Sequence, residues 1–178
     1  MAAFTVIDHE ELTGAAATWT SATIPSSYDH LYLTISARGA LAGSNDYEYV
    51  DVQFNGEVTG TNYSSTILWA GSTTPGSARE AGVNGLDRLI LMNADGSTAD
   101  TFGNASIWIP NYANTANYKQ ALGKFGCENA DATAWHWLIG VGAGLWSSTA
   151  AITSITIDPQ NGDLMQYSSF TLYGVTGA

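Results

Sequence analysis

The sequence contains few basic residues. Lysine and arginine together number 5 against 16 aspartates and glutamates, so the formal net charge is -11 over 178 residues. A chain this acidic is repelled by phosphate backbones and by anionic membranes, which excludes nucleic acids and membrane surfaces from the expected partners. The carboxylates are spread from Asp8 to Asp163 without a dense run, a pattern typical of a solubilising surface.

Cysteine is nearly absent, since Cys127 stands alone and cannot form an intrachain disulfide. The first residues show no basic region followed by an apolar run, so no secretory signal is predicted. The longest apolar stretch, 135–145, falls short of the ~18 residues of a membrane span and contains three glycines. We therefore expect a soluble protein, made in the cytoplasm, whose fold depends on packing.

Helical periodicity is also missing, whereas alternating patterns are common. Residues 29–38 and 47–54 alternate apolar and polar side chains, as strands with one buried face do. The second run ends in Asn55-Gly56, a pair that favours a type I′ hairpin turn. Both runs are predicted strands.

Further runs have the length and the β-branched or aromatic content of strands, and turn-forming residues separate them. They are residues 63–70, 87–93, 105–109, 118–124, 135–141, 151–157 and 168–175. About nine or ten strands predict an all-β fold, a β-sandwich that is jelly-roll-like, because two sheets must cover each other's apolar faces. We expect a single domain over residues 1–178, with residues 1–23 forming an arm or an edge strand.

Catalytic signatures are sparse. None of the three histidines has partners at metal-ligand spacing, and the nearest cluster, Asp8-His9-Glu10-Glu11, is interpreted as a solvated edge, with a divalent cation site as the alternative. Glu128 next to Cys127 is expected to raise the thiol pKa. A glycosidase pair of carboxylates stays open, because such a pair is assembled in space. We predict no catalytic residue, no metal, no cofactor and no enzyme activity.

Aromatic residues are abundant, with six tryptophans and nine tyrosines. Trp108 lies between Ile107 and Ile109, so a core position for the isoleucines points Trp108 away from the core. Trp135 and Trp137 share a strand face with Ile139, for which a core position is favoured over a sugar-stacking platform. The candidate interface or glycan-contact residues are Trp108, Trp146 and Tyr173.

In the C-terminal third, a run that ends in I-T-S-I-T-I at residues 152–157 is followed by a polar turn and by a last run of the form S-x-F-x-L-Y-G at residues 168–174. This order of strand, turn and last strand resembles that of a widespread group of tailed-bacteriophage virion structural proteins. The matching segments are residues 144–157, Asn161-Gly162 and 168–175, together with 24–31, 52–56, 61–65 and 109–115. Residues 164–167 depart from the pattern, because a shorter turn with alanine or glycine is usual there.

The resemblance implies a jelly-roll-like virion domain without catalytic residues. The first expectation is a capsid cement or decoration protein, a homo-oligomer and most simply a trimer, that binds the major capsid protein in a virion assembled in the bacterial cytoplasm. The second is a receptor-binding or carbohydrate-binding domain of a tail fibre, which the aromatic content favours. A glycosidase comes third.

Overall fold

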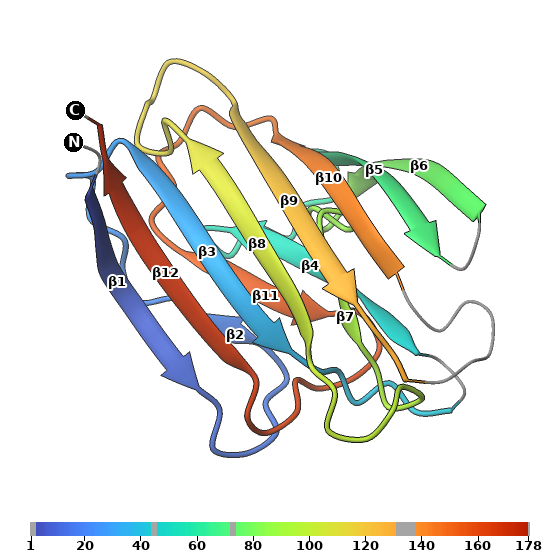
Figure 1. Cartoon of the computed structure of the whole chain (residues 1–178). Coiled ribbons are helices and arrows are strands. Elements are labelled where there is room, and N and C mark those ends of the chain that lie inside the picture. Colours follow the sequence, from blue (N-terminus) through green and yellow to red (C-terminus); the bar gives the residue numbers. More distant parts are fainter. Residues whose placement is uncertain (1–2, 44–45, 72–73, 131–137, 178) are drawn as a thin grey trace.

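The computed structural model describes residues 3–43, 46–71, 74–130 and 138–177, and it arranges them as two layers of β-sheet (Figure 1). The strands are β1 (Ala3–Glu11), β2 (Trp19–Thr20), β3 (His30–Ala37), β4 (Tyr47–Phe54), β5 (Tyr63–Gly71), β6 (Thr74–Val83), β7 (Leu91–Asn93), β8 (Gly103–Pro110), β9 (Lys119–Cys127), β10 (Leu138–Trp146), β11 (Ile155–Pro159) and β12 (Ser169–Thr176). The predicted all-β sandwich is confirmed, with twelve strands among the described residues in place of nine or ten.

The two sheets differ in size, and every strand pair in them is antiparallel. The large sheet has eight strands in the order β1-β12-β3-β8-β9-β10-β5-β6, and the small sheet has four in the order β2-β11-β4-β7. Most connections cross from one sheet to the other. The small sheet lies against one face of the large sheet and leaves the other face uncovered (Figure 1). The N-terminal segment provides an edge strand to each sheet, through β1 and β2.

The core lies between the sheets and follows from alternation along the strands. In β3 the side chains of Leu31, Leu33 and Ile35 are buried, and the residues between them point to the other side. In the last strand, β12, Phe170 and Leu172 enter the same core, where the Phe170 ring stacks on Trp19 at 4.7 Å. Apolar burial of this extent is the main favourable term in folding.

Within β10, residues 139–145 reverse the usual pattern, because the glycines there face the core and the aliphatic residues face outward. A Cβ on Gly142 would lie 2.7 Å from the Arg88 carbonyl oxygen and 2.8 Å from that of Leu89. The segment 85–90 therefore packs directly against the backbone of β10, and the buried side chains of Leu86 and Leu89 fill this part of the core. Residues 87–90 belong to this packed turn, so the strand predicted over 87–93 is reduced to β7.

Two other local predictions differ from the structure. No strand is predicted between residues 70 and 87, but β6 begins at Thr74 and is an edge of the large sheet. Asn55 and Gly56 have the positive φ values, 57° and 66°, of the predicted turn. They nevertheless lead from β4 in the small sheet to β5 in the large sheet, so they form no hairpin.

Both edges of the large sheet carry a β-bulge. On β1 the register shifts between Val6 and Asp8, which leaves Ile7 as the extra residue. On β6 Ala81 pairs with Ser64 and Val83 with Tyr63, so Gly82, with a φ of 73°, is the extra residue. Bulges interrupt the ladder of backbone groups that an edge strand presents.

Candidate functional site

The side of the large sheet that points away from the small sheet, here called the outer face, is the most distinctive surface of the molecule. Strand register aligns one row of residues across all eight strands. The row consists of Val6, Tyr173, Tyr32, Trp108, Leu122, Ala143, Thr66 and Arg79. A solvated sheet face normally carries polar side chains, so a row that is mostly apolar needs an explanation.

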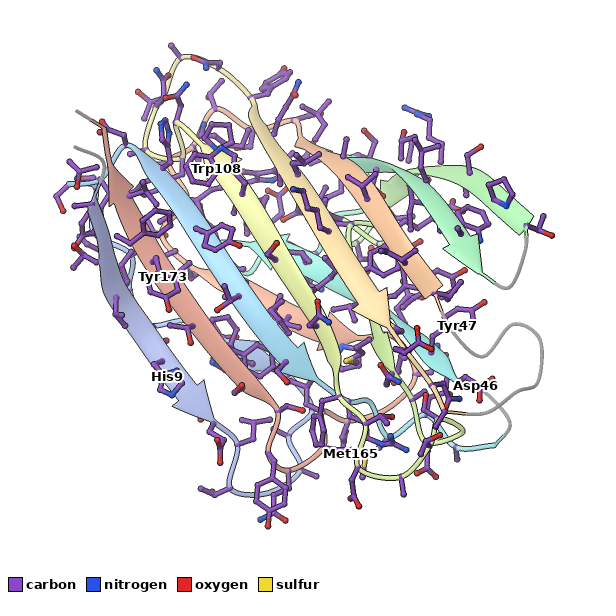
Figure 2. The ribbon with its side chains drawn as sticks, in the orientation of Figure 1. His9, Asp46, Tyr47, Trp108, Met165 and Tyr173 are labelled. Carbon is purple, nitrogen blue, oxygen red and sulfur yellow. The ribbon has the colours of Figure 1, made fainter. Side chains whose placement is uncertain are left out.

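One half of the outer face is aromatic. Tyr32 lies between Tyr173 and Trp108, with ring centroids 6.4 and 6.3 Å away, and the exposed Phe4 packs edge-on against Tyr32 at 5.8 Å. His30 lies 5.0 Å from Trp108 on the same side. Figure 2 shows Trp108 and Tyr173 on this face, over β8 and β12. The rings support one another across four neighbouring strands, β1, β12, β3 and β8.

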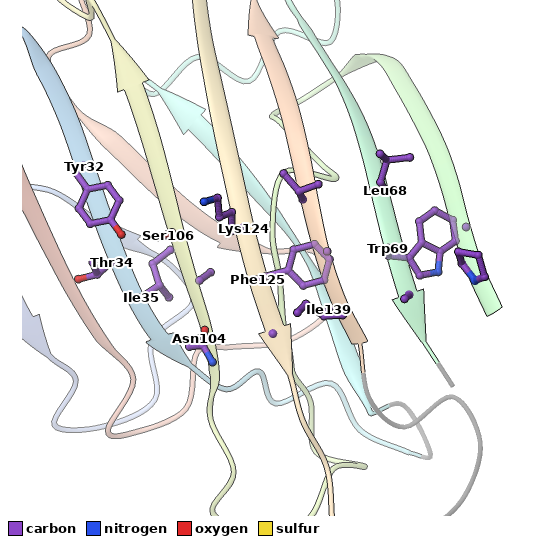
Figure 3. A pocket seen from close by; sticks show the side chains of 17 residues that line it. Tyr32, Thr34, Ile35, Leu68, Trp69, Asn104, Ser106, Lys124, Phe125 and Ile139 are labelled. Carbon is purple, nitrogen blue, oxygen red and sulfur yellow. The ribbon is translucent and has the colours of Figure 1, made fainter. Parts of the chain in front are cut away.

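The other half is an open, mostly apolar groove of about 980 Å³ that runs across the large sheet from β3 to β6 (Figure 3). Ile139 and Leu68 line it and are 64% and 58% exposed, and Val141 lies beside them. Gly126 occupies an outward position without a side chain, which deepens the groove between Asn104 and Ile139. The aliphatic side chains that line the groove are thus the ones that the reversed pattern of β10 turns outward.

The charge on the outer face differs from that of the rest of the molecule. The outward positions of the seven described strands from β12 to β6 include no aspartate or glutamate. They include two bases, Lys124 and Arg79, and neither lies within 4.0 Å of a carboxylate among the described residues. From β12 to β6 the outer face is therefore apolar and weakly cationic on a molecule of net charge -11, and on β1 Glu11 adds one outward carboxylate at the border of the sheet.

The remaining three bases are engaged elsewhere. The buried Arg38 guanidinium donates to the backbone oxygens of Asp95, Ser97, Thr98 and Thr101 and so holds that loop. Arg88 pairs with Glu80 at 2.8 Å and lies over the Tyr49 ring. Lys119 is buried, with its Nζ donating to two carbonyl oxygens, and burial lowers its pKa.

Carboxylates gather on the opposite side, along the small sheet. Asp51 lies directly across from Asp158 in the β4–β11 ladder. Gln160 donates to both Asp51 and Asp87, at 3.1 and 2.7 Å. Burial, followed by neighbouring carboxylates, raises the pKa of Asp51, and burial raises the pKa of Asp87. The two sides of the sandwich therefore differ sharply in charge.

Of the three residues predicted as contacts, the structure places two on the outer face and one in the core. Trp108 and Tyr173 are half-buried neighbours of Tyr32, and Ile107 and Ile109 are fully buried behind Trp108, as the alternation predicted. Trp146 is only 1% exposed. Its ring stacks on Tyr63 and its Nε1 donates to Glu57 at 2.8 Å, so Trp146 cannot offer a surface to a partner.

The interpretation of the tryptophan pair is changed at one residue. Trp135 and Trp137 lie outside the described residues, but Ile139, which was expected to continue their core face, is exposed in the groove. The reason is the reversed pattern of β10, in which Gly140 and Gly142 take the inward positions.

The acidic N-terminal cluster lies on edge strand β1. His9 Nδ1 is 2.8 Å from Thr171 Oγ1 on the outer face, whereas Asp8 is turned to the other side and accepts from the Ala22 amide at 2.7 Å. Within the described residues no group of three metal-ligating side chains comes together. Among the same residues no helix is long and apolar enough to cross a bilayer.

Cys127 is buried at the end of β9, where burial raises the pKa of the thiol to about 12. The predicted direction of the pKa shift is the same, but its cause is desolvation and not Glu128. A thiol in this state is a poor nucleophile.

The groove residues were missed from the sequence. Their signal lies in residues 138–145, where aliphatic residues alternate with glycine. Alternation gives the two faces of a strand but not which face is buried, and the aliphatic face is normally assigned to the core.

The sequence matches no known protein-family model and no curated protein at a significant level.

Proposed function

We propose that this chain is a structural protein of a tailed-bacteriophage particle that acts through the outer face of its large sheet. The observation that carries the proposal is the register-aligned row of apolar and aromatic side chains on a face that the small sheet leaves uncovered. Contiguous apolar surface on a sheet is typical of interaction sites. The resemblance of residues 144–157 and 168–175 to virion proteins supports this class of function.

Within that class the proposed role is capsid cement or decoration. The chain would oligomerise, most simply as a trimer, and bind the major capsid protein, so that the head resists heat or chelation. A compact sandwich without fibrous repeats suits a discrete cap on a lattice. No enzyme activity is proposed, since the groove residues include none of the carboxylates that a glycosidase pair requires.

The test compares capsids of the parent phage with and without the protein. Wild-type protein is expected to elute as an oligomer in light-scattering chromatography and to raise the temperature at which capsids release DNA. Ile139→Asp is expected to abolish capsid binding, because it places a charge in the apolar groove. Val58→Asp, at a similarly exposed aliphatic residue outside the groove, is the matched control and is expected to bind normally. A monomer that leaves capsids unprotected would contradict the proposal.

The aromatic half of the outer face favours a second candidate, a carbohydrate-binding domain of a tail fibre. Tyr32, Trp108 and Tyr173 form a continuous set of rings on which sugar rings could stack. Trp108→Ala is then expected to remove adsorption to host cells without lowering the melting temperature by more than a few degrees. A blank glycan array for the wild-type protein would count against this candidate.

A further inference from the structure

The outer face has a charge pattern that restricts what can cover it. Lys124 lines the groove, and its aliphatic stem lies next to Val141 in the β9–β10 register. Arg79 lies on β6, three strands away at a spacing of ~4.8 Å per strand. Both bases lack a carboxylate partner among the described residues, although the chain has 16 carboxylates.

A second copy packed face to face would bury these bases without compensation. The outward positions from β12 to β6 supply no carboxylate, and Glu11, the outward carboxylate of β1, lies in the register row of Ser169 and Pro75, apart from the rows of Lys124 and Arg79. Lys124 and Arg79 of both copies would therefore face mainly apolar groups, hydroxyls, amides and other bases. Burying an unpaired charge in this way is strongly unfavourable. The charge pattern therefore argues against the outer face as a symmetric self-association surface.

We infer that the outer face binds a different protein, through a surface with an apolar centre and aspartate or glutamate side chains placed opposite Lys124 and Arg79. This inference rests on the proposed function and identifies which side of the molecule meets the heterologous partner. The lining favours a protein over a glycan, because exposed Leu68, Ile139 and Val141 are aliphatic. Self-association is thereby assigned to another surface.

The first experiment selects short linear peptides from a random library on the immobilised wild-type protein. The selected peptides are expected to combine Leu, Ile or Phe with Asp or Glu. Their affinity is expected to fall about tenfold in Lys124→Gln/Arg79→Gln and to weaken at high salt. Thr13→Glu/Thr20→Glu, which lowers the net charge by the same amount at exposed positions off the outer face, is the control and should bind as the wild type does.

The second experiment uses the fact that the chain has only two lysines, of which Lys119 is buried. A carbodiimide condenses an amine with a carboxylate into an amide and takes up the water as a urea. We expect peptide mapping to find the selected peptide joined through its Asp or Glu to Lys124. In the protein alone, a cross-link from Lys124 to a second copy would overturn the inference.

The other outcomes are equally decisive. Selected peptides without carboxylates, or binding that is unchanged in Lys124→Gln/Arg79→Gln, would also overturn it, as would equally tight binding of the acidic polysaccharide polygalacturonate. The result is distinguishable from a failure of the proposed function. Acidic peptides that cross-link to Lys124 would support this surface even if the protein did not stabilise capsids. Conversely, loss of capsid binding in Ile139→Asp but not in Lys124→Gln/Arg79→Gln would support the apolar contact of the proposed function and overturn the role inferred for the two bases.

Discussion

At the residue scale, the two tryptophans singled out from the sequence show how neighbours decide a side chain's role. Trp108 has fully buried isoleucines on either side, so alternation turns it outward. Trp146 is two residues after Gly144 and four after Gly142 on β10, so its side chain points to the same inward side and lies in the core. Sequence reasoning could place Trp108 because its neighbours are apolar, and it could not place Trp146 because glycines gave no indication of the buried side.

This contrast gives a stability prediction. Trp146→Ala is expected to lower the free energy of unfolding by about 3–5 kcal/mol, because it opens a cavity and leaves Glu57 without its indole donor. Trp108→Ala should cost about 1 kcal/mol or less, since it loses only contacts on a sheet surface. Urea unfolding of both variants measures the difference, and equal losses would show that the assignment of faces is wrong.

At the scale of the element, alternation located most strands of the sandwich but not the unusual ones. Strand β6 was missed, because Pro75, Gly76 and Gly82 give it the composition of a turn. A strand was predicted over 135–141 but not as far as Trp146, where β10 ends. The glycines that interrupt the apolar run are what allow the segment 85–90 to pack on β10. Close backbone approach is a tertiary property, and local propensity does not contain it.

Substitution at these glycines tests the packing of the segment. Gly142→Ala is expected to destabilise the protein by about 1–3 kcal/mol, because the added methyl would lie within 3 Å of the backbone of Arg88 and Leu89. On the neighbouring strand, Gly126→Ala meets no atom closer than 3.6 Å and is the matched control. Thermal unfolding should separate the two variants. A stable Gly142→Ala protein would mean that the segment 85–90 moves aside at little cost.

At the scale of the whole molecule, charge is distributed unevenly. The outer face carries two bases that pair with no carboxylate of the described residues, and the other side carries neighbouring carboxylates at Asp51, Asp87 and Asp158. Composition predicted an acidic, soluble chain, but it could not predict the separation of charge. The separation depends on which strand faces are outward, and thus on the register and on the small sheet that covers only one side.

The buried carboxylates predict how stability changes with pH. Burial raises the pKa of Glu48, Asp51 and Asp87 in the folded protein above the ordinary values of 4.5 and 3.8. At pH values between the ordinary and the folded-state pKa values, the folded state therefore binds more protons than the unfolded state. The contribution of these groups to stability is fully present below the ordinary values. It is lost as the pH rises through the folded-state pKa values.

Glu48 is the sharpest case, because its Oε2 is buried without a hydrogen-bond partner among the described residues. We expect Glu48→Gln to lose less stability than the wild type as the pH rises above the ordinary value of 4.5, since one titrating group is removed. Denaturant titrations at a series of pH values from below to above this ordinary value measure the slope, and Glu11→Gln, at an exposed position on β1, controls for the change in net charge. An unchanged slope in Glu48→Gln would contradict the assignment.

The bulges at Ile7 and Gly82 bear on what kind of assembly the molecule permits. A long, regular edge accepts a strand from the next molecule, and repetition of that step produces fibres of indefinite length. Here both borders of the large sheet are interrupted, so growth by strand addition is discouraged at either end. The contact with the proposed partner is therefore expected to use a face of the large sheet, and not the addition of strands at its two borders.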